Sequence, residues 1–196
     1  MSNPRAPKVT GELKIPGFST YMHFMDETHL LTIGFDASDQ GDFAWFTGIM
    51  LQIFDVQGDT ATLLHKEIIG SRGTTSDATD DHLAFNYFPS DASGRAGKLA
   101  IPMGICEGGN QDGGYGSELT FNGLLVFDVS VEQGFSLTGM LDHQMPHKSR
   151  VRRTIGAAAI ATTGGNHRTP RSSAAFSCGE MAMKSSIRLR RIEFGW

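Results

Sequence analysis

One pattern occurs twice in this sequence and limits the folds that the chain can adopt. Residues 48–56 read GIMLQIFDV, and residues 123–130 read GLLVFDVS. Each consists of a glycine, an apolar run and the triplet Phe-Asp-Val. A second correspondence lies one segment earlier, between LLTIGFD at 30–36 and LAIPMGI at 99–105. A pattern that recurs with the same neighbours indicates a repeated unit of supersecondary structure.

Short segments around these patterns predict eight β-strands. They show alternating or continuous apolar side chains and are separated by turn signals rich in Gly and Asp. The 24 Gly residues among 196 exceed the usual fraction of about 7% and fit a chain with many tight turns. The predicted strands are residues 20–25, 29–37, 48–56, 61–70, 82–88, 98–105, 121–130 and 135–143. They fall into two sets of four.

A four-stranded unit that recurs along a chain is typical of a β-propeller blade, because such a sheet buries its two faces only on neighbouring sheets. We therefore expect an all-β fold, a partial β-propeller with about two four-stranded antiparallel blades. The blades run from Ser19 to about Gly70 and from Thr79 to about His143. Both lie within a propeller domain of residues 1–155.

The same motifs resemble a known family. The residues that carry the resemblance are FSTYMHFMDETHLLTIGFDASDQGDFAWFTGIMLQIFDV, KEIIGSRGTTSDATDDHLAFNYF, KLAIPMGICEGG, FNGLLVFDVSVEQGFSLTGMLDH and VRRTI. In this order, over about residues 10–155, they resemble bacterial and archaeal secreted proteins with a C-terminal β-propeller domain distantly related to WD40 repeats. The resemblance implies a propeller fold and an exported parent protein, which is extracellular or at the cell surface. It implies little about activity.

The sequence departs from this family at both ends. A family member has further blades before residue 1, so we expect this chain to be a fragment of a longer protein or the product of a truncated gene. A propeller closes with about four to eight blades, and two blades leave edges and a face uncovered. We therefore expect poor stability for this chain alone and self-association through its exposed blade edges.

Residues 156–196 are basic and show no regular pattern. Residues 1–143 hold 7 Lys and Arg against 19 Asp and Glu, whereas residues 144–196 hold 10 against 2. Residues 149–155 can begin a third blade, but the rest predicts an irregular or disordered basic tail. One hypothesis is that this tail is translated out of frame, which the coding DNA would decide. For that reason we expect no nucleic-acid partner despite the basic charge.

The sequence predicts no transmembrane segment, because it holds no run of about 18 apolar residues. The first residues lack the apolar region of a signal peptide, so none is expected in this chain. The two cysteines, Cys106 and Cys178, do not show the spacing of a metal site. A bridge between them is allowed but not indicated by the pattern. Without a Lys or His beside it in sequence, Cys106 is expected to be an inert thiol.

Asp36, Asp39 and Asp42 form an acidic loop with a spacing of three. Close carboxylates and loop carbonyls can hold Ca²⁺, which takes about six to eight oxygen ligands. The pattern is not that of an EF-hand. Two interpretations stand: a calcium site, and a solvated turn in which Asp and Gly end a strand.

Asp80, Asp81 and His82 precede a predicted inner strand. Inner strands line the central channel of a propeller, where carboxylates could bind a cation or orient a histidine. The alternative is that these residues cap the turn and face solvent. They are the candidates for a polar cluster in the channel.

The bulky residues Phe43, Trp45 and Phe46 are costly to leave in water. We expect them to fold back as a hydrophobic plug over the blade face, with a platform for stacking a ligand as the alternative. Asp55 and Asp128 occupy the same place in the two Phe-Asp-Val triplets. Side chains that recur in each blade are usually structural, so we expect both to accept hydrogen bonds from turn N–H groups.

The function that these features favour is a non-enzymatic binding or scaffold module, which takes a protein or carbohydrate ligand through its loops or channel end. The sequence has no G-x-S-x-G or H-E-x-x-H motif, which leaves few residues for catalysis. The alternative from another class is a metal-dependent hydrolase that uses Asp80, Asp81 and His82 around a cation. A third is a truncated gene product without function.

Overall fold

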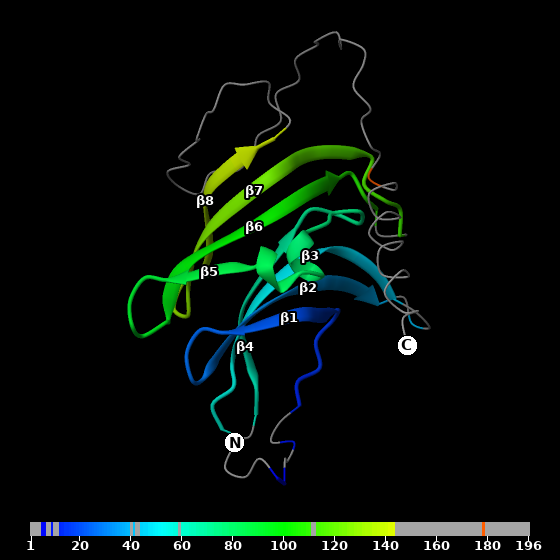
Figure 1. The fold of residues 1–196 in the computed structure, drawn as a ribbon. Helices are drawn as coiled ribbons and strands as arrows, with labels where there is room; N and C mark the ends of the chain where they lie inside the picture. Colours follow the sequence, from blue (N-terminus) through cyan, green and yellow to red (C-terminus); the bar gives the residue numbers. More distant parts are fainter. Residues whose placement is uncertain are drawn as a thin grey trace, which may run out of the picture.

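The computed structural model describes residues 5–6, 9, 12–39, 41, 44–58, 60–110, 113–143 and 178, which we call the described residues. They form two four-stranded antiparallel sheets with strand orders β1-β2-β3-β4 and β5-β6-β7-β8 (Figure 1). We name the first sheet blade A and the second blade B. The all-β prediction with two four-stranded units is therefore confirmed.

The strands of each blade follow one another in sequence and pair with their chain neighbours. Blade A contains β1 (Phe18–Phe24), β2 (His29–Asp39), β3 (Ala44–Asp55) and β4 (Thr62–Ile69). Blade B contains β5 (Asn86–Pro89), β6 (Ala96–Glu107), β7 (Glu118–Ser130) and β8 (Gly134–Asp142). Two short 3₁₀-helices, η1 (Asp77–Thr79) and η2 (His82–Ala84), lie between the blades in sequence.

The repeat seen in the sequence is also present in the strand register. Leu30 pairs with Phe54 in blade A, and Leu99 pairs with Phe127 in blade B, so the two Phe-Asp-Val triplets occupy equivalent positions. Immediately before each of these Phe residues, the pairing with the fourth strand shifts through a β-bulge. A shared register and a shared bulge show that the two blades are built on one plan.

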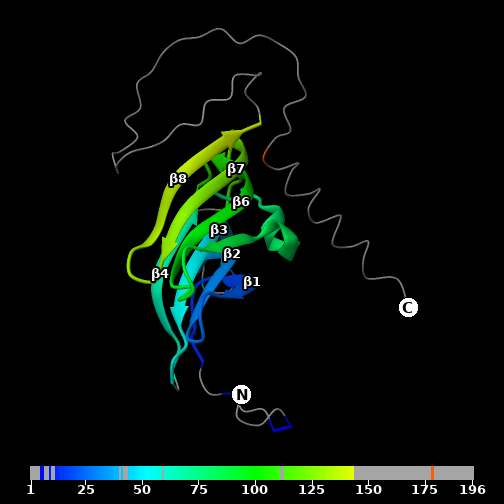
Figure 2. The same cartoon turned by 60° about the vertical axis from the view of Figure 1, so that its left-hand side comes forward.

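The core lies between the two blades, which stack face to face (Figure 2). Side chains alternate between the faces of a strand, and the odd-numbered residues of the central strands meet in this core. They are Leu31, Ile33, Ile49, Leu51 and Ile53 of blade A with Leu99, Ile101, Met103, Phe121, Leu125, Phe127 and Val129 of blade B. Full burial of one such side chain contributes about 1.5–3 kcal/mol. Each blade therefore depends on the other for most of its apolar burial.

The predicted strand over residues 82–88 is wrong in its first half. Residues 82–84 form η2, and pairing begins only at Asn86. The Asp81 side chain accepts a hydrogen bond from the backbone N–H of Leu83 and caps this turn. The cap satisfies a backbone donor locally, so the segment forms a turn of 3₁₀-helix although its apolar residues fit a strand.

Candidate functional site

One end of the two blades carries a cluster of aromatic rings, an arginine and a disulfide. Its described parts are the paired ends of β2 and β3 at residues 37–39 and 44–46, residues 70–76 after β4, and residues 108–110 and 113–117 between β6 and β7. We call it the loop end. Its segments come from both blades, so the packing of blade A on blade B sets their relative positions.

The centre of the loop end is the guanidinium group of Arg72. Its Cζ atom lies 4.2 Å from the ring centroid of Trp45 and 4.4 Å from that of Tyr115. Nη1 donates a hydrogen bond of 2.5 Å to the carbonyl oxygen of Gly113, and no other acceptor for this guanidinium lies among the described residues. Two cation–π contacts and one hydrogen bond hold the group in place and leave further N–H donors for a ligand.

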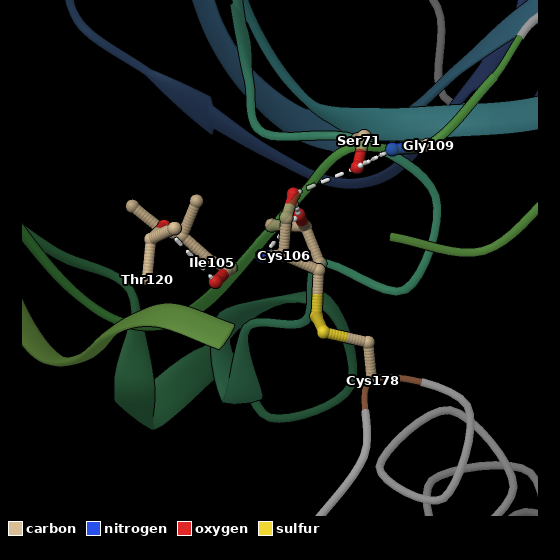
Figure 3. Close-up of a disulfide and its surroundings, with 7 residues drawn as sticks. Ser71, Ile105, Cys106, Gly109, Thr120 and Cys178 are labelled. Atoms are coloured by element: carbon tan, nitrogen blue, oxygen red, sulfur yellow. Dashed lines mark hydrogen bonds between the residues drawn. A yellow bond between two sulfur atoms is a disulfide. The ribbon is translucent and has the colours of Figure 1, made fainter. Parts of the chain in front are cut away.

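A disulfide joins Cys106, in β6, to Cys178 at an S–S distance of 2.16 Å (Figure 3). The carbonyl oxygen of Cys106 accepts a hydrogen bond of 2.8 Å from Ser71 Oγ, which in turn accepts one from the N–H of Gly109. The N–H of Cys106 donates to Thr74 Oγ1 at 3.0 Å. The residues on both sides of Arg72 are thus tied to β6, and the expectation that Cys106 is an inert thiol is wrong.

The aromatic residues at this end do not fold back over the blade. Trp45 and Phe46 extend β3 by pairing with Ser38 and Ala37 of β2, which corrects the expected hydrophobic plug; Phe43 lies outside the described residues. The ring of Phe46 packs on those of Phe18 and Phe35, with centroids 5.2 and 6.2 Å apart. Phe46 and Tyr115 keep 48% and 46% of their surface exposed, so the loop end presents aromatic surface to solvent.

The acidic loop does not gather its carboxylates within the described residues. Asp36 accepts hydrogen bonds from Lys66 Nζ at 2.5 Å and from Thr47 Oγ1 at 2.8 Å. Asp39 accepts one from the N–H of Gly41 at 2.8 Å, which is the capping role of a solvated turn. Asp42 lies outside the described residues. Calcium binding by these three residues therefore stays a prediction.

The residues proposed for the channel also have local partners. Asp80 is the C-cap residue of η1, and Asp81 is the N-cap residue of η2, as the capping alternative predicts. The ring of His82 lies 6.5 Å from that of Tyr21. No group of three or more His, Cys, Asp or Glu that could hold a metal ion occurs in the described part of the chain. A cation at Asp80, Asp81 and His82 stays a prediction.

The two aspartates of the Phe-Asp-Val triplets are structural in different ways. Asp55 accepts a hydrogen bond of 2.8 Å from the N–H of Gln57, as expected for a residue at a strand end. Asp128 is instead inside β7 and forms an ion pair with Lys98 of β6. The turn-capping expectation therefore holds for Asp55 and is wrong for Asp128.

A second polar cluster, which sequence reasoning missed, lies at the opposite end of the strands. Asp26 accepts hydrogen bonds from the backbone N–H groups of Thr28 and His29 and from His29 Nδ1. Burial opposes ionisation of Asp26, but these bonds outweigh it and hold its pKa below the usual value. Arg95 of blade B lies 3.9 Å from Asp26 and 2.8 Å from Glu132. The cluster links the turns of the two blades.

A row of rings joins the inner strands of the two blades. Tyr21 lies 5.0 Å from Phe85 between centroids, and His23 lies 5.5 Å from Tyr87 and 6.1 Å from Phe85. Burial lowers the pKa of His23 below its ordinary value. The neutral imidazole is therefore the form that packs in this row.

Acidification is expected to destabilise the chain through His23. The pKa of His23 is lowered in the folded state, so the unfolded state binds more protons below about pH 6.5. The free energy of unfolding therefore falls as the pH decreases from about 6.5 toward the folded-state pKa of His23. Replacing His23 with Gln should make this dependence shallower between about pH 7 and 5, as measured by urea unfolding at each pH. Equal slopes for wild type and variant would show that His23 does not carry the effect.

Comparisons with known proteins match a family model and short segments of archaeal relatives. A family model described as "Beta propeller domain" matches residues 1–163. An uncharacterized protein of Archaeoglobus fulgidus is 41% identical over 61 residues, 31% of this chain and 8% of that relative. An uncharacterized protein of Methanocaldococcus jannaschii is 53% identical over 36 residues, 18% of this chain and 6% of that relative. No solved structure matches the chain.

Within the described residues, no helix has the length and apolar character needed to cross a membrane.

Proposed function

Since this chain belongs to the beta propeller domain family, we propose that it is a non-enzymatic recognition module that binds an acidic segment of a partner protein at its loop end. The observation that carries this proposal is the Arg72 guanidinium held between Trp45 and Tyr115. Planar guanidinium groups bind carboxylates through paired N–H donors. Trp, Tyr and Arg are also the residues that contribute most to binding energy at protein interfaces.

The local bonding of the acidic residues also favours recognition over catalysis. Asp36 is engaged by Lys66 and Thr47, and Asp81 by the N–H of Leu83. A metal-dependent hydrolase would need such carboxylates to be free to bind a cation. Hydrolytic activity that is lost on chelation, or a rise in melting temperature on adding Ca²⁺ that EDTA reverses, would favour the hydrolase or calcium-site alternatives.

We propose further that the two blades belong to a larger ring, and that the distant relation to WD40 repeats holds. The segments matched in the two archaeal relatives span 8% and 6% of those proteins, which leaves room for further blades. An exported location is part of the same proposal and is supported by the Cys106–Cys178 disulfide, because disulfides persist mainly in oxidising compartments. Fractionation of the source cells tests the location.

Replacing Arg72 with Ala is expected to weaken binding of Asp- and Glu-rich peptides by about tenfold or more, since a central anchor is lost. Replacing it with Lys should weaken binding too, because Lys keeps the charge but loses the planar fork. The measurement is fluorescence anisotropy with labelled peptides at two salt concentrations.

Arg95→Ala is the matched control, since Arg95 is at the opposite end of the strands, and it should bind the peptides as the wild type does. A glycan array forms the second arm. Arg72→Ala binding the peptides as tightly as the wild type, or glycans captured in place of peptides, would overturn the proposed partner.

A further inference from the structure

The disulfide brings a distant part of the chain against the Arg72 site. Gly73 follows Arg72 directly, and a Cβ atom added to Gly73 would lie 3.2 Å from Cys178 Cβ and 3.3 Å from the Cys178 carbonyl oxygen. The same added atom would lie 3.3 Å from Cδ1 of Tyr115, one of the two rings that hold the Arg72 guanidinium. Cys178 therefore packs beside this site, in space that a side chain at position 73 would fill.

The position of Cys178 is fixed because its disulfide partner belongs to a strand. Cys106 lies in β6, and both of its backbone polar groups are bonded, the N–H to Thr74 Oγ1 and the carbonyl oxygen to Ser71 Oγ. Both cysteines are shielded from solvent, with 0% and 2% of their surface exposed. The residues that follow Cys178 in sequence therefore start from a fixed point beside the Arg72 site (Figure 3).

The sequence places a carboxylate immediately after this fixed point. Residues 144–196 hold only 2 acidic residues, Glu180 and Glu193, against 10 Lys and Arg. Glu180 is two positions after Cys178, and two residues extend at most about 7 Å. The residue between them, Gly179, can adopt backbone conformations that other residues avoid. Glu180 lies outside the described residues, so the tether at Cys178 is what limits its position, and that tether keeps it near the site.

The Arg72 guanidinium has donors that match a nearby carboxylate. The side chain is half-buried, and among the described residues only the carbonyl oxygen of Gly113 accepts a hydrogen bond from it. A guanidinium carries five N–H donors, and two of them can bind one carboxylate side by side. The Glu180 carboxylate has the same chemistry as the acidic segment proposed as the ligand. The tail of this chain and an acidic partner would therefore compete for the same donors.

We propose that Glu180, tethered through the disulfide, is an internal competitor for Arg72 and so regulates recognition at the loop end. This inference rests on the proposed function and adds a regulatory element to it. A group on so short a tether acts at an effective concentration of about millimolar. A single ion pair of this kind is weak, so a partner segment that makes several contacts displaces Glu180, whereas an isolated carboxylate does not. The tail therefore selects against weak acidic ligands.

The test is the affinity of the oxidised full chain for a labelled poly-glutamate peptide, measured by fluorescence anisotropy at low salt. Glu180→Gln keeps the size of the side chain and removes its charge, and it should tighten binding by about two- to fivefold, which is the range for one exposed ion pair. Glu193→Gln is the matched control. It removes the same charge from the same region but lies much farther from Cys178 in sequence, so it should bind as the wild type does.

Two further backgrounds identify the target and the tether. In the Arg72→Ala chain, Glu180→Gln should not change the affinity, because the group for which Glu180 competes is gone. In the chain with Cys106 and Cys178 both replaced by Ala, Glu180→Gln should also have no effect, because the tether is lost. Additive effects of Arg72→Ala and Glu180→Gln would show that the two side chains do not interact.

Urea unfolding without peptide separates this inference from the proposed function. Arg72→Ala and Glu180→Gln should be coupled in a double-mutant cycle of unfolding free energies, whether or not any acidic peptide binds. Zero coupling, wild-type affinity in Glu180→Gln, or an equal gain in Glu193→Gln would each overturn the internal competitor. If Arg72→Ala still weakens peptide binding in those cases, the proposed function stands. Coupling without any peptide binding would instead support the internal contact and overturn the proposed partner.

Discussion

Reduction of the Cys106–Cys178 disulfide is expected to lower the free energy of unfolding by about 4 kcal/mol. The two cysteines are 72 positions apart in sequence, and a cross-link that closes a loop of this length removes much conformational entropy from the unfolded chain. The bond also holds Cys106 beside Ser71 and Thr74, which position Arg72. Urea unfolding followed by circular dichroism, with and without reductant, measures the difference.

The double variant with Cys106 and Cys178 both replaced by Ala is the control. It should unfold at the same urea concentration as the reduced wild type, and reductant should not change its unfolding. Reduced chain should also lose affinity for acidic peptides if the cross-link positions Arg72. Unfolding of the double variant at the urea concentration of the oxidised wild type would contradict a stabilising bond.

Most of the fold could be predicted because a strand buried on one or both faces shows directly in its sequence. The central strands β2, β3, β6 and β7 hold long apolar runs, and their predicted positions agree with the structure to within a few residues. The two Phe-Asp-Val triplets predicted the repeat, which the register confirms. The short inner strand β5 was predicted too long, because the cap from Asp81 to Leu83 outweighs the apolar pattern.

The loop end could not be predicted, since its parts are far apart in the sequence. Arg72 lies between Trp45, 27 positions before it, and Tyr115, 43 positions after it, and no local pattern connects the three. The disulfide partner of Cys106 lies in a segment with no regular sequence pattern. Gly113 also lies close to the Trp45 ring: a Cβ atom added to Gly113 would be 2.4 Å from two ring carbons. Only the packed fold reveals this contact.

For the acidic residues, the sequence could offer only alternative roles, because the partner of each carboxylate is set by the fold. An Asp in a turn can bind a cation, cap a backbone N–H or pair with Lys, and the sequence does not distinguish these roles. The structure assigns the role of Asp36: this β2 residue forms an ion pair with Lys66 of β4, and β3 lies between the two strands. It also does so for Asp26, whose bonds to Thr28 and His29 are local and could have been inferred from the turn itself.

Truncation of Leu51 to Ala is expected to cost about 2–5 kcal/mol of stability and to weaken both blades together. Leu51 is fully buried in the centre of β3 and belongs to the core that the two sheets share. Because that core lies between the blades, a cavity beside Leu51 removes contacts from blade B as well as from blade A. Urea unfolding gives the loss, and native-state hydrogen exchange shows which amides lose protection.

Leu64→Ala in β4 is the matched control, because Leu64 is 37% exposed and its truncation should cost less than about 1 kcal/mol. In the Leu51→Ala variant, the slowest amides of β3 and β7 should lose protection by the same factor, since one shared core implies one cooperative unit. Loss of protection in β3 with wild-type protection in β7 would mean that blade B folds without blade A. In that case the burial at the interface would stabilise the pair without determining the fold of either sheet.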